Sequence, residues 1–116
     1  MSIKHNKLVD EILDYLAKTG VLATDTDSSR YGRGAGKRAK VRKGWSDITA
    51  CLPPHGKFLA IEVKIDTDVL SDDQILIRDQ VVTKGGLHIE ARDLDDVING
   101  IKNYKDTLKK DLKVYS

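Results

Sequence analysis

One segment near the middle of the chain, residues 57–65, restricts the fold more than any other. It reads Lys-Phe-Leu-Ala-Ile-Glu-Val-Lys-Ile, and its length and apolar, partly β-branched composition predict a β-strand. Alternation along a strand places Leu59, Ile61 and Val63 on one face. Because so few positions are polar, we expect an interior strand, on which a charged side chain needs a compensating reason. The opposite face then carries Phe58, Ala60, Glu62 and Lys64.

Helical and strand-like patterns alternate on either side of this segment. Apolar residues recur at helical spacing near the N-terminus, and Ser71-Asp-Asp-Gln74 fits a capping box. Pro53-Pro54-His55-Gly56 is typical of a turn and favours an antiparallel hairpin. This order predicts a single α/β domain spanning residues 1–116 around one sheet. The expected helices cover residues 2–18, 71–84 and 93–113, and the further strands cover residues 21–28, 47–52 and 87–91.

The bulk composition indicates a soluble globular protein, with 40% apolar and 33% charged residues. No apolar run approaches the roughly 20 residues that span a bilayer, and no secretory signal is visible at the N-terminus. The single cysteine, Cys51, lies in an apolar strand, where an inert buried thiol is expected. These features are consistent with a reducing compartment, and we expect a cytoplasmic location in a bacterial or phage-infected host cell.

Charge is unevenly distributed along the chain. The net charge is +2, but residues 30–43 hold seven cations and no acid, a local charge of +7. The other 102 residues hold 13 basic and 18 acidic side chains and therefore sum to −5. With four glycines between residues 32 and 44, this stretch predicts a basic, glycine-rich loop at 30–44 that contacts phosphates. Its predicted nucleic-acid contacts are Arg30, Arg33, Lys37, Arg38, Lys40, Arg42 and Lys43. A solubilising loop, or a tail for acidic partners in general, is the alternative.

The basic loop leads into Asp47, which precedes Glu62 by 15 residues. In the expected hairpin, Asp47, Glu62 and Lys64 would converge at one edge of the sheet. Two carboxylates suit Mg²⁺ or Mn²⁺, and a nearby lysine can stabilise charge on a phosphate. Asp at a turn and Glu-x-Lys on a strand are also common as solvated ion pairs. The residues alone leave both interpretations open.

The motifs that follow one another along the chain resemble a known family. Gly44-Trp-Ser-Asp47, a hairpin, Phe58-Leu-Ala-Ile-Glu-Val-Lys64, Leu70-Ser-Asp-Asp-Gln74 and Gly85-Gly86 together look like the VRR-NUC group of the PD-(D/E)XK nuclease superfamily. The resemblance covers residues 1 to about 102. It implies a restriction-endonuclease-like core, with a central mixed sheet flanked by helices. One position departs from the pattern, since Ser46 stands where the superfamily name has Pro.

The resemblance also implies a role for each matching residue. Asp47 and Glu62 would bind Mg²⁺ or Mn²⁺, with the Val63 carbonyl as a further ligand. Lys64 would act on the attacking water. The resemblance also implies that the protein cuts DNA, so these roles together describe a metal-dependent endonuclease.

Two helical residues complete the set that the resemblance implies. Gln74 would support the site, although position N3 of a capping box explains a glutamine there equally well. Glu11 matches the family's N-terminal acidic position and would lie near a metal or its waters. An ordinary solvated glutamate at the margin of the apolar stripe is the alternative for Glu11.

The other candidate residues carry weaker signals. The histidines His5, His55 and His88 are scattered without zinc-type spacing, so we expect a surface, a turn and a strand residue respectively. Trp45, next to the expected site, is predicted to be partly buried, with base stacking as the less favoured alternative. A narrow apolar stripe in the last helix would close the core or pair with a second copy. It consists of Ile101, Tyr104, Leu108, Leu112 and Tyr115.

Standalone members of the family resemble dimeric Holliday-junction resolvases. The resemblance therefore implies a homodimer that cuts branched DNA, and a small phage or mobile-element enzyme would suit it. Two alternatives remain at this stage. The first is a non-catalytic nucleic-acid-binding module that retains the nuclease fold, and the second is a protein-interaction domain with a basic arm.

Overall fold

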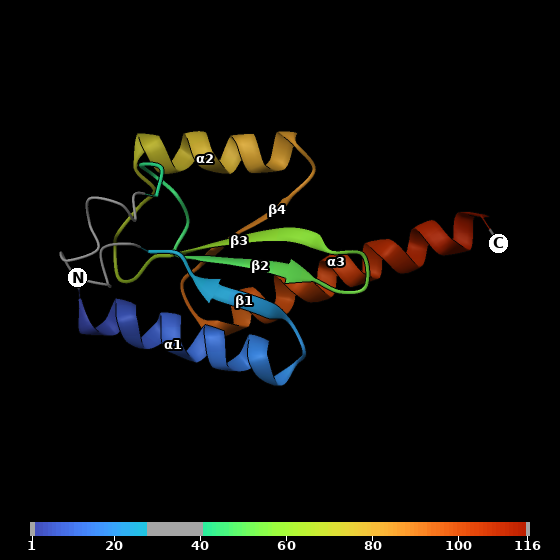
Figure 1. The fold of residues 1–116 in the computed structure, drawn as a ribbon, viewed down its shortest axis with the longest axis horizontal. Coiled ribbons are helices and arrows are strands. Elements are labelled where there is room, and N and C mark those ends of the chain that lie inside the picture. The colour runs from blue at the N-terminus through green and yellow to red at the C-terminus, as the bar shows by residue number, and fades with distance from the viewer. Residues whose placement is uncertain (1, 28–40, 116) are drawn as a thin grey trace.

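A computed structural model describes residues 2–27 and 41–115, and their side chains as far as residue 110. Three helices and four strands follow one another in the predicted order (Figure 1). The predicted ends of the elements agree with the structure to within about two residues, apart from β1, which is shorter than expected. The elements are α1 (Ile3–Lys18), β1 (Leu22–Asp25), β2 (Ile48–Leu52), β3 (Lys57–Val63), α2 (Asp72–Thr83), β4 (Leu87–Ala91) and α3 (Leu94–Tyr115).

The strands form one mixed sheet in the order β1-β2-β3-β4. The β1–β2 and β2–β3 pairs are antiparallel, whereas β3 and β4 are parallel. The crossover between β3 and β4 is α2, which is the usual way to join parallel neighbours. The prediction of a hairpin and of an interior central strand is confirmed, and the α/β fold with a mixed sheet flanked by helices is observed.

The helices cover the two faces of the sheet unequally. In Figure 1, α1 and α3 lie on one side of the sheet and α2 lies on the other. The larger core forms between the sheet and the α1–α3 side, where Leu59, Ile61 and Val63 are fully buried. They pack with buried residues of the two helices, Val9, Ile12, Leu16, Val97 and Ile101.

A smaller core lies under α2. Ala60 of β3 packs there with Ile77 and Val81 of the helix, and Trp45 is partly buried against them, as predicted. The two cores confirm the alternation expected for β3. On the same face, nearer β1, α2 leaves apolar side chains exposed: Leu22 is 78% and Phe58 is 39% accessible.

The uneven covering corrects the prediction for Cys51. Register pairs Cys51 with Leu22 on one side and Phe58 on the other, so the three side chains share the face that carries α2. Cys51 is exposed rather than buried. An apolar strand predicts burial only where a helix covers both faces, and α2 does not reach this row.

The segment that leads into β2 packs tightly against the start of α2. Gly44 has a φ of +85°, and a Cβ at this position would lie 2.5 Å from the Asp73 carbonyl at the start of α2. Only glycine fits such a contact without displacing backbone. The contact fixes the segment leading to Asp47 against α2.

The C-terminal helix extends beyond the body of the domain (Figure 1). Ile101 is buried and Tyr104 packs against the larger core, so the first part of the predicted stripe closes that core. The side chains of Leu112 and Tyr115 lie outside the described residues. Within residues 2–27 and 41–115, none of the helices is both long and apolar enough to cross a membrane.

Candidate active site

The antiparallel register of β2 and β3 brings the two predicted carboxylates together. Ile48 pairs with Ile61, so Asp47, just before β2, lies across from Glu62. Both side chains are buried, with 6% of Asp47 and 2% of Glu62 accessible. Buried carboxylates are rare unless a partner or a function compensates for the loss of water.

Two elements hold the Asp47 carboxylate. Its Oδ2 accepts a hydrogen bond from the Val63 backbone N–H at 2.8 Å. The same oxygen lies 3.3 Å from Nε2 of His5, from the first turn of α1. Burial raises the pKa of Asp47 above its ordinary value, and the hydrogen bond from Val63 opposes that rise.

Only one of the two Glu62 carboxyl oxygens accepts a hydrogen bond from the described residues. Its Oε1 accepts a hydrogen bond from Nε2 of Gln74 at 3.0 Å. Its Oε2 is buried and accepts no hydrogen bond from the described residues, while the protonated carboxyl makes a hydrogen bond with the side chain of Asp47. Burial, with the nearby Asp47 charge as the second cause, raises the pKa of Glu62 to about 9. The apoprotein therefore holds a proton on Glu62 at neutral pH, and a cation would have to displace it.

Gln74 forms the capping box and also contacts Glu62, while its support of a metal site stays a prediction. Its Oε1 accepts from the Ser71 N–H at 2.9 Å, and the Ser71 hydroxyl accepts from the Gln74 N–H at 3.2 Å. These two hydrogen bonds form the capping box of α2. The amide nitrogen of the same side chain donates to Glu62. The helix cap thus holds the Gln74 amide in place for Glu62.

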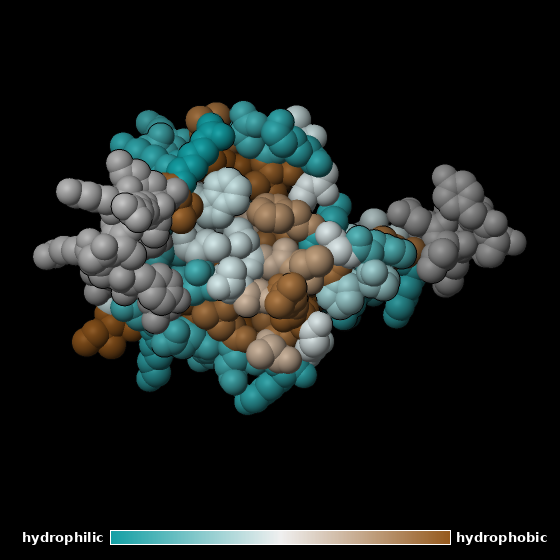
Figure 2. Space-filling model, in the orientation of Figure 1, coloured by the Kyte–Doolittle hydropathy of each residue, from teal (hydrophilic) through white to brown (hydrophobic). Residues whose placement is uncertain are grey.

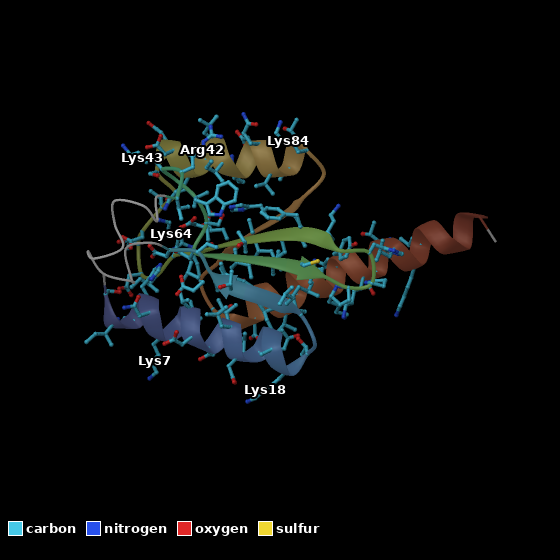
Figure 3. All side chains as sticks on the ribbon, viewed as in Figure 1. Lys7, Lys18, Arg42, Lys43, Lys64 and Lys84 are labelled. Atoms are coloured by element: carbon cyan, nitrogen blue, oxygen red, sulfur yellow. The ribbon has the colours of Figure 1, made fainter. Side chains whose placement is uncertain are left out.

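Lys64 follows the last residue of β3 and is half-buried. Its backbone N–H donates to the Ala91 carbonyl at 3.0 Å, which continues the β3–β4 pairing past Val63. Figure 3 shows Lys64 at the end of the sheet, below α2 and above α1 in this view. Its charge lowers the pKa of Glu62 but does not outweigh burial.

The sequence interpretation missed two residues near Asp47, His5 and Asp27, and it expected His5 on the surface. His5 lies four residues before Val9 and seven before Ile12, so it continues the buried stripe of α1. That spacing was the available signal. Single ligand atoms of His5, Asp27 and Asp47 all lie within 4.8 Å of one another. The grouping adds a nitrogen donor and a third carboxylate to the neighbourhood of Asp47.

Glu11 lies in different surroundings. It is exposed and lines an open hollow of about 340 Å³ with Lys7, Ile65 and Arg92. From α1, it is His5 that contacts Asp47. The ligand role of Glu11 stays a prediction, as does that of the Val63 carbonyl.

Of the predicted nucleic-acid contacts, Arg42 and Lys43 belong to the described residues. Both are exposed, and Lys43 Nζ lies 3.3 Å from Asp73 at the start of α2. Figure 3 shows both beside α2. The other five, Arg30, Arg33, Lys37, Arg38 and Lys40, lie outside the described residues.

The donors present suit a divalent cation. Asp47 and Glu62 offer carboxylate oxygens, the ligands that Mg²⁺ and Mn²⁺ prefer. The close pairing of these two buried carboxyls is the structural sign of fit, because a cation would replace the proton that Glu62 holds beside Asp47. His5 would favour Mn²⁺ over Mg²⁺ if it took part, since imidazole is a softer donor than carboxylate.

A mixed sheet that brings two buried carboxylates and a lysine to one end defines a nuclease-like α/β domain. The model of the VRR-NUC domain family matches residues 12–92, and the chain belongs to that family. The VRR-NUC domain is a nuclease-family domain.

The fold has a solved counterpart. A structure described as a VRR_NUC domain protein is similar to this chain with a TM-score of 0.63 and 18% sequence identity. The match covers 90% of this chain and 89% of that one. No curated protein matches the chain in sequence.

Proposed function

We propose that this protein is a metal-dependent endonuclease that hydrolyses DNA phosphodiester bonds. The observation that carries the proposal is the buried pair Asp47 and Glu62 at the end of the sheet, with Lys64 directly after the strand that carries Glu62. Burying two adjacent carboxyls is costly for a fold, and a divalent cation would replace the proton that Glu62 holds beside Asp47. Membership of a nuclease family supports the same conclusion.

Asp47 and Glu62 would hold Mg²⁺ or Mn²⁺, with the Val63 carbonyl and Glu11 as the further ligands that the resemblance implies. A divalent ion in such a site polarises a phosphoryl group and makes a nearby water more acidic. His5 and Gln74 would fix the two carboxylates from α1 and α2, because each contacts one of them directly. Such supporting contacts set ligand orientation and so tune affinity.

Lys64 would act on the water and the phosphate. Alternation puts it on the same face of the strand as Glu62, about 6.6 Å further along the backbone. From there the ammonium group would orient the attacking water and stabilise the charge that develops on the phosphate oxygens. The family resemblance implies a cut that leaves a 5′-phosphate and a 3′-hydroxyl.

The basic segment would supply attraction for the substrate. The acidic side chains near Asp47 repel a polyphosphate, so cations outside the site must bring DNA to it. Residues 30–43 carry +7 and lead directly into Gly44 and Asp47. Arg42 and Lys43, both exposed, lie where the segment meets α2. Phosphate contacts of this kind give affinity without reading sequence.

We further propose a homodimer that acts on branched DNA such as a Holliday junction. Two sites related by a two-fold axis suit a substrate with two strands to cut. The part of α3 that extends beyond the body of the domain offers a surface for a second copy (Figure 1). Sedimentation would show the dimer, and removal of residues 108–116 would shift it to monomer.

A cleavage panel tests the proposed function. Wild-type protein is incubated with Mg²⁺ or Mn²⁺ and with linear, flap and four-way DNA, alongside Lys64→Ala and Glu62→Gln. Lys57→Ala is the matched control, because Lys57 lies at the opposite end of the same strand over the ring of Tyr104. We expect the two site variants to lose cutting by at least roughly a hundredfold while Lys57→Ala cuts normally. Tight, salt-dependent binding without any cutting would instead support the non-catalytic module.

A further inference from the structure

A second hollow, of about 300 Å³, opens between α2 and the sheet. Its floor is apolar and aromatic, and its rim is basic and polar. Figure 2 shows pale and brown side chains gathered over the strands on this face, between the more hydrophilic margins formed by α1 and α2. The lining residues used below are Trp45, Phe58, Gly86, Arg42, Lys84 and Gln80.

Two aromatic rings, those of Trp45 and Phe58, form part of the floor of the hollow. The centroids of Trp45 and Phe58 lie 6.3 Å apart, and the rings are inclined by 61°, an edge-to-face arrangement. In that geometry one ring turns its edge to the other and keeps its own faces free of its partner. Phe58 is 39% accessible, which is unusual for the largest apolar side chain of an interior strand. An accessible aromatic face of this kind suits a flat partner.

The hollow stays open because Gly86 has no side chain. A Cβ at this position would lie 3.2 Å from Cδ2 of Phe58 and 2.7 Å from Cγ1 of Val81. Any larger residue would therefore push into the space between β3 and α2. The glycine keeps the Phe58 ring accessible from the side of α2.

The rim adds positive charge and hydrogen-bonding capacity. Arg42 enters from the end of the basic segment, and Lys84 comes from the C-terminal cap of α2. Figure 3 shows both cations along the same helix. Gln80, one turn before Lys84, offers an amide that can both donate and accept. Aromatic rings beside cations and an amide suit a flat heterocycle attached to a phosphate.

The hollow and the metal-type site share one face of one strand. Phe58 and Glu62 are four residues apart on β3 and point to the same side, which places them about 13 Å apart. Trp45 precedes Asp47 by two residues. It packs beside Ala60, which lies between Phe58 and Glu62 on β3. A DNA strand that reaches Glu62 can therefore place a neighbouring nucleotide at the hollow.

We propose that the hollow binds a single unpaired nucleobase of the DNA substrate, close to the phosphate that is cut. This rests on the proposed function and specifies its substrate as DNA that offers an unstacked base. The basic rim favours a nucleotide over an apolar peptide segment, since a peptide would leave Arg42 and Lys84 without an opposite charge. A base in a paired duplex cannot reach such a hollow without leaving the stack.

Trp45 allows a direct test, because it is the one tryptophan of the chain. Its fluorescence is followed in EDTA while the protein is titrated with a duplex that carries a one-nucleotide bulge. The same duplex with an abasic bulge is the control for charge and shape, and anisotropy of a labelled strand reports binding separately. We expect quenching by the bulged base at least twice that by the abasic site. Equal quenching, or none while anisotropy shows binding, would overturn the proposal.

Variants check the same point without relying on Trp45, whose removal could disturb the core. Phe58→Leu keeps the apolar volume and removes the aromatic face. We expect it to weaken binding to the bulged duplex about tenfold and binding to the abasic duplex by less than about twofold. Leu22→Ala is the matched control, since Leu22 is more exposed on the same face and does not line the hollow. An equal effect of Phe58→Leu on both duplexes would contradict base binding.

Base binding at the hollow and DNA cleavage can succeed or fail independently of each other. If wild-type protein cuts branched DNA but shows no base-dependent quenching, the hollow has another occupant and the nuclease proposal stands. If bulged DNA quenches Trp45 and Phe58→Leu abolishes the effect but no DNA is cut with any divalent ion, base binding stands and the nuclease proposal fails.

Discussion

Glu62 shows at the scale of one residue how a buried carboxyl destabilises the fold that carries it. The carboxyl is buried on an interior strand, beside the second buried carboxyl of Asp47. Burial favours the neutral form, so the folded protein holds the Glu62 proton up to a pKa of about 9, against an ordinary value of 4.5. A residue without an ionisable group would be more favourable for stability at this position.

The first prediction concerns Glu62→Gln in the absence of metal. Between pH 4.5 and pH 9 the unfolded chain has lost this proton while the folded chain keeps it, so wild-type stability falls as the pH rises. Glutamine removes that dependence. We expect the variant to be more stable than wild type by about 1–3 kcal/mol at pH 8.5, several degrees in Tm, with a smaller gain at pH 5. Thermal melts in EDTA measure this, with Glu90→Gln, an exposed carboxyl of the adjacent strand, as the control. A gain that is independent of pH would contradict the assignment.

The second prediction concerns His5, which contacts Asp47 from α1. Loss of a residue that orients a ligand commonly lowers metal affinity by about 10- to 100-fold. We therefore expect His5→Ala to weaken Mn²⁺ binding by at least roughly tenfold. His55→Ala, in the exposed hairpin turn, should bind Mn²⁺ as wild type does. Equal affinities for His5→Ala and wild type would remove His5 from the site.

At the scale of elements, the site depends on how α2 is placed against the entry to β2. Gly44 passes so close to Asp73 that a Cβ would lie 2.5 Å from backbone atoms. The same helix start carries Gln74, which reaches Glu62. The contact thus places the entry to β2, which precedes Asp47, beside the start of α2, which carries Gln74.

The third prediction compares two glycines with positive φ. Gly20 has a φ of +79°, and a Cβ there would meet no described atom within 4 Å. Gly20→Ala should therefore cost about 1–2 kcal/mol for the left-handed backbone alone. Gly44→Ala has the same cost plus the clash with Asp73, so we expect a greater loss of stability and weaker Mn²⁺ binding. Chemical denaturation and metal titration of the two variants measure these effects. Equal losses at both positions would show that the contact does not matter.

Patterns within one element predicted most of this architecture. Alternation in residues 57–65 and the Pro-Pro turn were sufficient to predict the hairpin and the opposition of Asp47 and Glu62. Features that depend on how two elements lie against each other were missed. His5 follows the apolar stripe of α1, but the stripe does not tell which end of the sheet the helix crosses. Cys51 is exposed because α2 covers only part of its face, and no single strand pattern contains that fact.

At the scale of the whole molecule, charge is divided between an acidic body and one cationic segment. The +7 segment ends at Arg42 and Lys43, beside α2, and Arg42 lines the aromatic hollow. The acidic centre needs such a neighbour to bind a polyanion. Affinity for DNA and affinity for metal should therefore reside in different residues.

The fourth prediction separates these two affinities. Neutralising Arg33, Lys37, Arg38 and Arg42 together should weaken DNA binding and reduce its salt dependence, by a slope of about 0.9 for each phosphate that the protein no longer neutralises. Mn²⁺ binding should stay close to that of wild type. DNA titrations at several salt concentrations, with a metal titration of the same variant, measure both. Parallel loss of DNA and metal binding would show that the segment belongs to the fold of the site.

Calorimetric titration of Mn²⁺ into the protein at pH 8, in two buffers of different ionisation enthalpy, tests most directly whether Asp47 and Glu62 form a metal site. We expect wild type to bind Mn²⁺ and to release close to one proton per ion, because Glu62 must ionise to become a ligand. Asp47→Asn and Glu62→Gln should each weaken binding by at least roughly tenfold, and Glu62→Gln should abolish the proton release. Binding of equal strength by wild type and both variants, or no binding by wild type at millimolar Mn²⁺, would contradict the metal site and the nuclease mechanism that depends on it.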